Sequence, residues 1–272
     1  MNFRWLGVAG FELELNGSTL LVDPFLTRPP VYRLLWGRVP PDQSLLHRYI
    51  HRADHILISH AHYDHLLDAA MIAGYTGAMV YGSEHTCRLA AACGLLDAQI
   101  QRVRPGDQLS LPAQGANETF EVTILAGKHT PLPLYGSGRL PERLGYPLRL
   151  RDFVLDETFS FLIEAGGTRL LAWHNHHPRP APRADILLLI PDVPHADLPE
   201  LLNLVQPRLL IPIHWDNFFR PLDAPLRLSW RIPTWRRPWL ERADPFALKR
   251  LLQRTYPEVE VRVPVLLESF DT

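Results

Sequence analysis

The segment 56–65 constrains the fold most, because an apolar strand runs directly into a cluster of metal-binding side chains. Residues 56–59 read Ile-Leu-Ile-Ser, which is typical of a buried strand. Four side chains able to bind a metal follow within six positions: His60, His62, Asp64 and His65. Imidazole and carboxylate ligands at this density suit zinc or another borderline divalent metal. The pattern predicts a site for one or two ions where a buried strand ends.

Short apolar runs recur along the chain with polar or glycine-containing breaks. We expect strands over Phe3–Val8, Phe11–Leu15, Thr19–Val22, His55–Ser59, Ala78–Tyr81, Phe120–Leu125, Phe159–Glu164, Arg169–Trp173, Ile186–Ile190 and Leu209–Ile213, with a closing edge strand over Val259–Leu267. Periodicity and capping residues predict helices over Leu66–Ile72, Ser83–Ala92, Leu198–Val205 and Pro245–Thr255. Many short strands with fewer helices predict an α+β fold of two packed sheets with helices outside.

A chain of 272 residues, 46% of them hydrophobic, can bury one substantial core, and we expect a single domain over residues 1–272. Its 26 prolines concentrate in three connections, the loops 24–52, 131–155 and 218–240. Long proline-rich connections inside a compact domain are more often functional loops or lids than linkers. We therefore expect these loops near the metal site.

Charge and cysteine content restrict the partners and the compartment. Lysine and arginine number 28 against 29 acidic residues, so no excess of positive charge favours a nucleic-acid partner. No apolar run reaches the ~18 residues of a membrane span, and we find no signal-peptide core. Cys87 and Cys93 lack zinc-knuckle spacing and are expected to be small core residues in a reducing compartment. We expect a cytoplasmic protein, and leave open a peripheral membrane contact and a homo-oligomer.

The motif His-x-His-x-Asp-His after a buried strand resembles the signature of the metallo-β-lactamase superfamily. Asp23, in Leu-Leu-Val-Asp-Pro-Phe, is similar to the early aspartate that supports the metal loop in that family, although Asp-Pro also opens ordinary turns. His129, in Gly-Lys-His-Thr-Pro, and His214, in Ile-Pro-Ile-His-Trp-Asp, resemble later ligands, although alone each would more often be a structural histidine.

The resemblance implies a four-layer αββα sandwich and two ligand sets. One ion would be held by His60, His62 and His129. The other would be held by Asp64, His65 and His214. Zinc is the expected ion, with manganese or iron as alternatives.

One family feature is missing. Members with two metals usually present a Gly-Asp pair after a strand, with the aspartate bridging both ions, whereas residues 171–177 here read Leu-Ala-Trp-His-Asn-His-His. His174 or Asn175 falls at that position, and neither carries the negative charge that holds two cations close together. We expect an altered second site: either His174 is a replacement ligand, or the second ion binds weakly or not at all. Asp192 and Asp216 are further candidates.

The expected chemistry follows from the ion. A bound divalent metal lowers the pKa of water to about 7 and polarises the oxygen under attack, so we expect a metal-dependent hydrolase that uses a metal-bound hydroxide on an ester, lactone or phosphodiester. Asp64 and His65 are the candidate catalytic residues, with Asp64 orienting the hydroxide and carrying its proton. Three segments most resemble the branch that includes ascorbate-6-phosphate lactonase and N-acyl-phosphatidylethanolamine phospholipase D: Trp5–Phe11, Val22–Phe25 and Ile211–His214.

The substrate is expected to be a small molecule, with a phosphorylated or amphipathic one as a hypothesis. Residues 220–239 interleave arginines with tryptophans: Arg220, Arg227, Arg231, Arg236 and Arg237 with Trp230, Trp235 and Trp239. Arginine suits phosphate, and tryptophan suits an apolar group. The same segment could instead be a self-packed surface or a subunit interface. Two further loops would add apolar walls if they overhang the metals, through Tyr32, Leu34, Leu35 and Trp36 and through Leu132, Leu134 and Tyr135.

Two other interpretations stay open at this point. Because the bridging carboxylate is the family feature that this chain lacks, the chain could be a catalytically altered metal-binding or ligand-sensing module. An iron oxygenase or electron carrier on the same scaffold is less favoured, because the ligand set is rich in histidine and no flavin or second redox domain follows.

Overall fold

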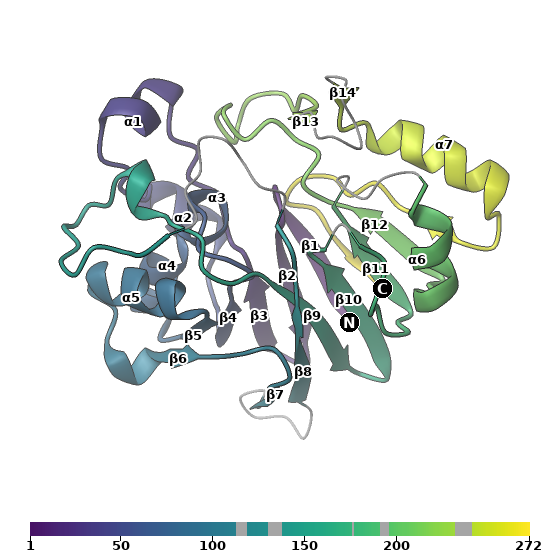
Figure 1. Cartoon of the computed structure of the whole chain (residues 1–272), viewed down its shortest axis with the longest axis horizontal. Coiled ribbons are helices and arrows are strands. Elements are labelled where there is room, and N and C mark those ends of the chain that lie inside the picture. The colour runs from purple at the N-terminus through teal and green to yellow at the C-terminus, as the bar shows by residue number, and fades with distance from the viewer. Residues whose placement is uncertain (113–118, 130–137, 176, 191–195, 232–240) are drawn as a thin grey trace.

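The computed structural model describes residues 1–272 except 113–118, 130–137, 176, 191–195 and 232–240. Two seven-stranded sheets lie face to face with helices on both outer sides (Figure 1). The first sheet has the order β16-β1-β2-β3-β4-β5-β6. Its strands are β1 (Asn2–Gly7), β2 (Gly10–Leu15), β3 (Ser18–Val22), β4 (His55–Leu57), β5 (Met79–Gly82), β6 (Ile100–Arg102) and β16 (Ser269–Asp271). Pairing is antiparallel from β16 to β3 and parallel from β3 to β6.

The second sheet has the order β15-β12-β11-β10-β9-β8-β7. Its strands are β7 (Gln108–Pro112), β8 (Thr119–Ala126), β9 (Phe159–Ala165), β10 (Thr168–Trp173), β11 (Ile186–Leu189), β12 (Leu209–Pro212) and β15 (Glu260–Val261). Strands β7 to β10 pair antiparallel, and β10, β11, β12 and β15 pair parallel. A separate antiparallel pair joins β13 (Trp230–Arg231) and β14 (Glu241–Arg242).

Helices cover the outer face of each sheet (Figure 1). The first sheet carries α1 (Val31–Trp36), α2 (Gln43–Tyr49), α3 (Tyr63–Leu66), α4 (Ala69–Thr76) and α5 (Glu84–Ala92), and the second carries α6 (Leu198–Val205) and α7 (Pro245–Thr255). Short 3-10 turns lie at Asp97–Gln99 and Leu150–Asp152. Side-chain caps begin α5 and α7: the Ser83 hydroxyl accepts from the Thr86 amide, and Asp244 accepts from the amides of Phe246 and Ala247. None of the helices described is long and apolar enough to cross a membrane.

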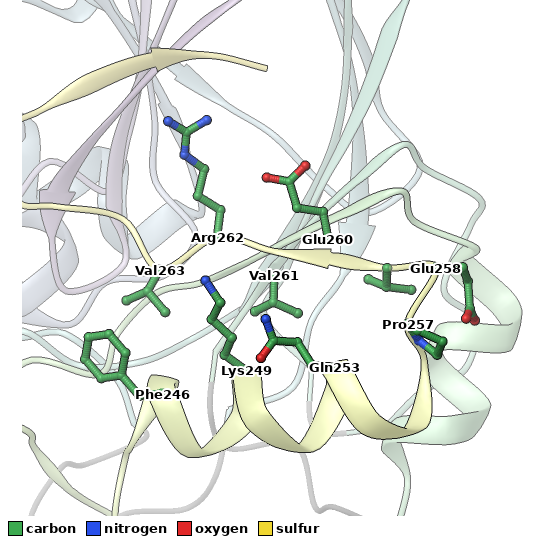
Figure 2. A pocket seen from close by; sticks show the side chains of 10 residues that line it. Phe246, Lys249, Gln253, Pro257, Glu258, Glu260, Val261, Arg262 and Val263 are labelled. Carbon is green, nitrogen blue, oxygen red and sulfur yellow. The ribbon is translucent and has the colours of Figure 1, made fainter.

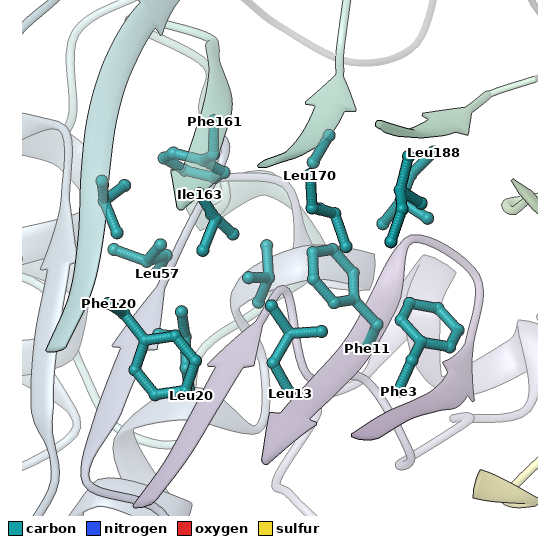
Figure 3. Close-up of a cluster of buried hydrophobic side chains, with 14 of the residues drawn as sticks. Phe3, Phe11, Leu13, Leu20, Leu57, Phe120, Phe161, Ile163, Leu170 and Leu188 are labelled. Atoms are coloured by element: carbon teal, nitrogen blue, oxygen red, sulfur yellow. The ribbon is translucent and has the colours of Figure 1, made fainter. Parts of the chain in front are cut away.

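The alternation of side chains along the strands divides the apolar residues among three cores. In β3, Leu20 and Val22 face the other sheet, whereas Leu21 faces the helices. Phe3, Phe11 and Leu13 of the first sheet meet side chains of the second sheet in the central core (Figure 3). The outer cores lie under α2 to α5 on one side and under α6 and α7 on the other. This arrangement confirms the predicted two-sheet sandwich with helices outside.

Several local predictions were wrong. The closing strand expected over Val259–Leu267 is reduced to Glu260–Val261, and Ser269–Asp271 instead closes the first sheet beside β1. In place of the single helix expected over Leu66–Ile72 there are two helices: α3 ends at Leu66, and α4 begins at Ala69. The segment 24–52, expected to be a loop, contains α1 and α2. Its prolines and cap residues stand before these helices and do not interrupt them.

Candidate metal centre

The metal-binding segment begins where β4 ends. His62 is the residue before α3, and its carbonyl accepts from the amides of His65 and Leu66. This single helical turn brings Asp64 and His65 back beside the two preceding histidines. All four side chains are buried, as the apolar strand before them predicts. The segment follows β4 and contains α3, so it lies where a strand of the first sheet ends (Figure 1).

Three groups of side chains converge here, and in each group the candidate ligand atoms lie within 4.8 Å of one another. The first group is His60, His62 and His129. The second is Asp64, His65 and His214. The third is Asp23, His65 and His174. The first two are the sets that the family resemblance implied, and both combine the segment after β4 with a histidine that follows a strand of the second sheet, β8 or β12.

The first group fits a metal ion on its own geometry. His60 places Nδ1 2.9 Å from the Ser59 hydroxyl, whereas its buried Nε2 has no hydrogen-bond partner among the residues described. A buried nitrogen without a partner is costly unless something else binds it. Burial, and then the neighbouring histidines, hold the pKa of His60 well below its usual value. Burial and His129 lower that of His62 to about 3, so both imidazoles are neutral at pH 7, the state that binds metal.

Asp23 supports the segment from beneath. Its carboxylate accepts from the Ser59 amide at 2.7 Å, from the Ser59 hydroxyl and from His65 Nδ1 at 2.7 Å. Burial alone would raise the pKa of Asp23, but His65 and His174 hold it well below its usual value. A carboxylate bound to one ring nitrogen fixes the tautomer of the histidine and leaves the other nitrogen to face a metal. Asp23 therefore has the supporting position that the resemblance implied.

Asp64 lies between two histidines of the second group. Its Oδ2 is 3.8 Å from His65 Nε2 and 3.7 Å from His214 Nε2. Burial alone would raise its pKa, but His65, His214 and His62 lower it below the usual value. Burial likewise opposes the charge on His65, yet Asp23 and Asp64 raise the pKa of that histidine. By themselves, these side chains thus favour an ionised carboxylate beside a histidine that attracts a proton.

His174 is one of the two residues expected at the position of the missing bridging aspartate, and it does not join the second group. It is buried, and its Nε2 lies 3.4 Å from Asp23 Oδ2. Neither of its ring nitrogens makes a hydrogen bond with the described part of the chain. Its amide donates to the Ser160 hydroxyl, and its carbonyl accepts from the Lys128 amide beside His129. Asn175 instead accepts from the amide of His177 in a local turn.

Close backbone contact ties the segments of His129 and His174 together. A Cβ atom on Gly127 would lie 2.9 Å from the His174 carbonyl oxygen and 2.8 Å from the Thr158 side chain. Only glycine therefore fits there without displacing the chain.

A buried network holds the backbone of His214. The His214 amide donates to the Val8 carbonyl at 2.7 Å, and Val8 in turn donates to Asp216 Oδ1 at 2.8 Å. Asp216 Oδ2 pairs with Arg28 Nη2 at 2.6 Å, and both side chains are almost fully buried. Val8 and His214 both have left-handed backbone, with φ of 51° and 59°. Asp216 is therefore engaged behind His214, and Asp192 lies outside the described residues.

Only part of the predicted arginine and tryptophan segment can be placed. Arg227 and Trp230 line a pocket of about 860 Å³ next to Trp215, together with Arg242, Arg250 and Phe246. The Arg242 guanidinium lies 4.7 Å from the Trp230 ring. Trp235, Arg236, Arg237 and Trp239 lie outside the described residues, as do Leu132, Leu134 and Tyr135.

A different pocket, of about 540 Å³, lies between α7 and β15 (Figure 2). Its charged residues are of both signs, Lys249 and Arg262 with Glu258 and Glu260. It contains no member of the three metal-binding groups, so it is separate from the candidate centre.

The comparisons with known proteins agree with this geometry. A model of the "Beta-lactamase superfamily domain" matches residues 18–174. The chain belongs to the metallo-β-lactamase superfamily. A UPF0173 metal-dependent hydrolase of Methanopyrus kandleri is 38% identical over 225 residues, which cover 80% of this chain and 85% of the relative. This match places the chain in the UPF0173 metal-dependent hydrolase family, and the predicted enzyme class is confirmed at the level of the family.

Other matches are shorter or more distant. The chain spans about half the length of a UPF0173 relative from Pyrobaculum arsenaticum, with 35% identity over 130 residues, 48% of this chain and 51% of the relative. The solved structure of Igni18, a metallo hydrolase from Ignicoccus hospitalis, has a TM-score of 0.61 and 17% identity, and the match covers 100% of this chain and 98% of that one. At that identity the likeness shows the fold alone. The lactonase or phospholipase branch remains a prediction.

Proposed function

We propose that this chain hydrolyses an ester, lactone or phosphodiester bond of a small molecule at the centre formed by the first two groups. The observation that carries the proposal is the position of the Asp64 carboxylate, less than 4 Å from two candidate ligands, His65 and His214. Beside it the three histidines of the first group converge. A carboxylate among imidazoles is the combination that hydrolytic metal sites use.

The chain offers two places for an ion. His60, His62 and His129 would hold one, and Asp64, His65 and His214 would hold the other. A bound divalent ion lowers the pKa of water and polarises the oxygen under attack. Zinc is proposed as the native ion because imidazole dominates the donor set.

Asp64 is proposed as the proton carrier. Its lowered pKa leaves the carboxylate ionised at neutral pH, so it can accept the proton that water loses during attack. It then returns that proton to the leaving oxygen, which completes hydrolysis without a serine or cysteine nucleophile. His65, held by Asp23 on its other nitrogen, is proposed to fix the orientation of this carboxylate.

We propose His174 as the neutral replacement for the bridging aspartate. The support is its buried ring, whose Nδ1 has no hydrogen-bond partner within the described residues and whose Nε2 lies 3.4 Å from Asp23, in one group with His65. A neutral ligand does not offset the repulsion between two cations. The ion of the second group should therefore bind more weakly than that of the first.

An amphipathic anion is the substrate class that we propose. The support is the pocket beside Trp215, the residue after His214, in which three arginines and a single acidic residue, Asp244, meet two exposed aromatic rings. Arg227→Ala should raise KM for an aryl phosphodiester and leave KM for an uncharged ester unchanged. An equal change for both substrates would count against an anion-binding role.

A binding or sensing module is the second candidate, and the lack of a carboxylate at position 174 favours it. Purification without added metal, metal analysis and assays on lactone, phosphodiester and β-lactam panels separate the two. Hydrolysis requires turnover that Asp64→Asn removes and that the exposed control His51→Asn retains. Stoichiometric metal without turnover on any panel would instead support the module.

A further inference from the structure

The short helix α1 presents an apolar face to solvent. Trp36 is 77% exposed, Tyr32 62%, Leu35 58% and Val31 48%. Counted from Val31, the other three residues follow one, four and five positions later. They therefore lie on adjoining parts of one helical surface. Leu34 is buried in the core beneath and anchors the helix. Figure 1 shows α1 standing out from the rest of the sandwich.

Arginines lie beside this apolar face, mainly at the C-terminal end of α1. Arg33 lies within α1, and Arg38 follows it and donates to the carbonyls of Gly145 and Pro147. The Val39 amide also donates to the Leu148 carbonyl, so residues 139–152 lie beside the end of α1. A pocket of about 390 Å³ there is lined by four arginines and one acidic residue: Arg38, Arg143, Arg149, Arg151 and Asp152. This positive region contrasts with a net charge of −1 for the whole chain.

We propose that α1 and this arginine cluster form a docking surface for an anionic lipid bilayer. Tryptophan and tyrosine bodies with apolar neighbours insert into the boundary between headgroups and acyl chains, and arginines bind anionic headgroups. In Figure 1, α1 protrudes from the sandwich, and a bilayer accepts a protruding apolar helix without a matching groove. The proposal does not depend on which bond the metal centre cleaves.

A second copy of the chain fits this surface less well. An isologous dimer uses the same patch on both copies, so it would bring two arginine-rich surfaces together. A stable interface also buries about 800 Å² on each partner, far more than four side chains of a six-residue helix provide. Charge and size therefore both favour a lipid surface.

The test is co-sedimentation of the metal-loaded, full-length protein with vesicles at about 100 mM salt. Binding is expected to vesicles that contain phosphatidylglycerol and not to pure phosphatidylcholine, and it should weaken as salt rises. Leu35→Ser combined with Trp36→Ser should reduce binding at least tenfold. Leu96→Ser is the matched control, because Leu96 is also an exposed apolar side chain, at 68%, but lies outside α1 and outside the pocket proposed for the substrate, so it should leave binding unchanged.

The arginines are tested separately. Arg143→Gln combined with Arg151→Gln should reduce binding by about 25-fold, at ~fivefold for each arginine. Arg104→Gln combined with Arg179→Gln removes the same charge elsewhere and should have a much smaller effect. No binding to anionic vesicles, or equal losses in both pairs, overturns the proposal. So does a dimer in sedimentation velocity that the Leu35→Ser, Trp36→Ser variant converts to a monomer.

Discussion

The buried pair Arg28–Asp216 should couple stability to the backbone of His214. In Asp216→Asn the side-chain oxygen can still accept from Val8, but the Arg28 guanidinium loses its carboxylate in a site that excludes water. Removing one partner of such a pair costs about 3–5 kcal/mol. For a chain of this size, 3 kcal/mol corresponds to about 6–12 °C in Tm. Arg28→Met should cost a similar amount, because it leaves the buried carboxylate without its counter-charge.

The double variant decides whether the charge pair is responsible. Arg28→Met combined with Asp216→Asn removes both charges and retains the acceptor for Val8, so it should regain at least half of the summed losses in thermal unfolding followed by circular dichroism. The control is the exposed pair Arg169–Glu164, whose removal should cost about 1 kcal/mol or less. Additive losses at the buried pair would refute the reasoning. Asp216→Ala, which also removes the Val8 acceptor, should in addition weaken binding of the ion at His214 by about 10–100-fold in metal titration.

Three further outcomes are expected. Asp64→Ala should lower kcat by about 10²–10⁴-fold in steady-state assays and leave a folded protein by circular dichroism; an unchanged kcat would exclude Asp64 as proton carrier. His174→Asp should raise the bound metal toward two ions per chain, measured by atomic emission, and His174→Ala should lower it; equal metal content in both variants would exclude a ligand role. Burial raises the pKa of Asp68 from 3.8 to about 6, so between these pH values the folded state binds more protons than the unfolded state. Stability should therefore fall by about 2 kcal/mol as pH rises from 4 to 7. The difference in Tm between wild type and Asp68→Asn should follow that fall, and a difference independent of pH would contradict the shift.

Local patterns predicted the features that depend on neighbours in the chain. The strand before His60 and the dense cluster of metal-binding side chains after it lie within ten residues. The end of the buried strand could therefore be predicted from the local sequence. Helices α6 and α7 match their predicted bounds because periodicity and nearby prolines define both of them. The first two ligand groups were obtained by family resemblance, since no local signal brings His129 or His214 to the segment after β4.

Features that depend on distant contacts could not be predicted. Arg28 and Asp216 are 188 positions apart, and nothing in either sequence neighbourhood indicates a buried pair. The strand at Ser269–Asp271 forms because its backbone meets β1, not because its three residues favour a strand. His174, and not Asn175, lies beside the candidate ligands. This choice depends on where β10 ends and on the hydrogen bond from the Lys128 amide to the His174 carbonyl. Proline content also concealed α1, because prolines before a helix resemble those of a loop.

Each candidate ion would be held by both sheets, since His129 and His214 follow strands of the second sheet and their partners follow β4 of the first. The separation of the sheets therefore sets the distances between ligands, and aromatic packing such as the Trp5–Trp215 stack, with ring centroids 5.0 Å apart, helps to set that separation. Preferred ligand distances differ by a few tenths of an ångström between metals. A substitution deep in the central core, remote from every ligand, would thus change which metal the protein selects from a mixture.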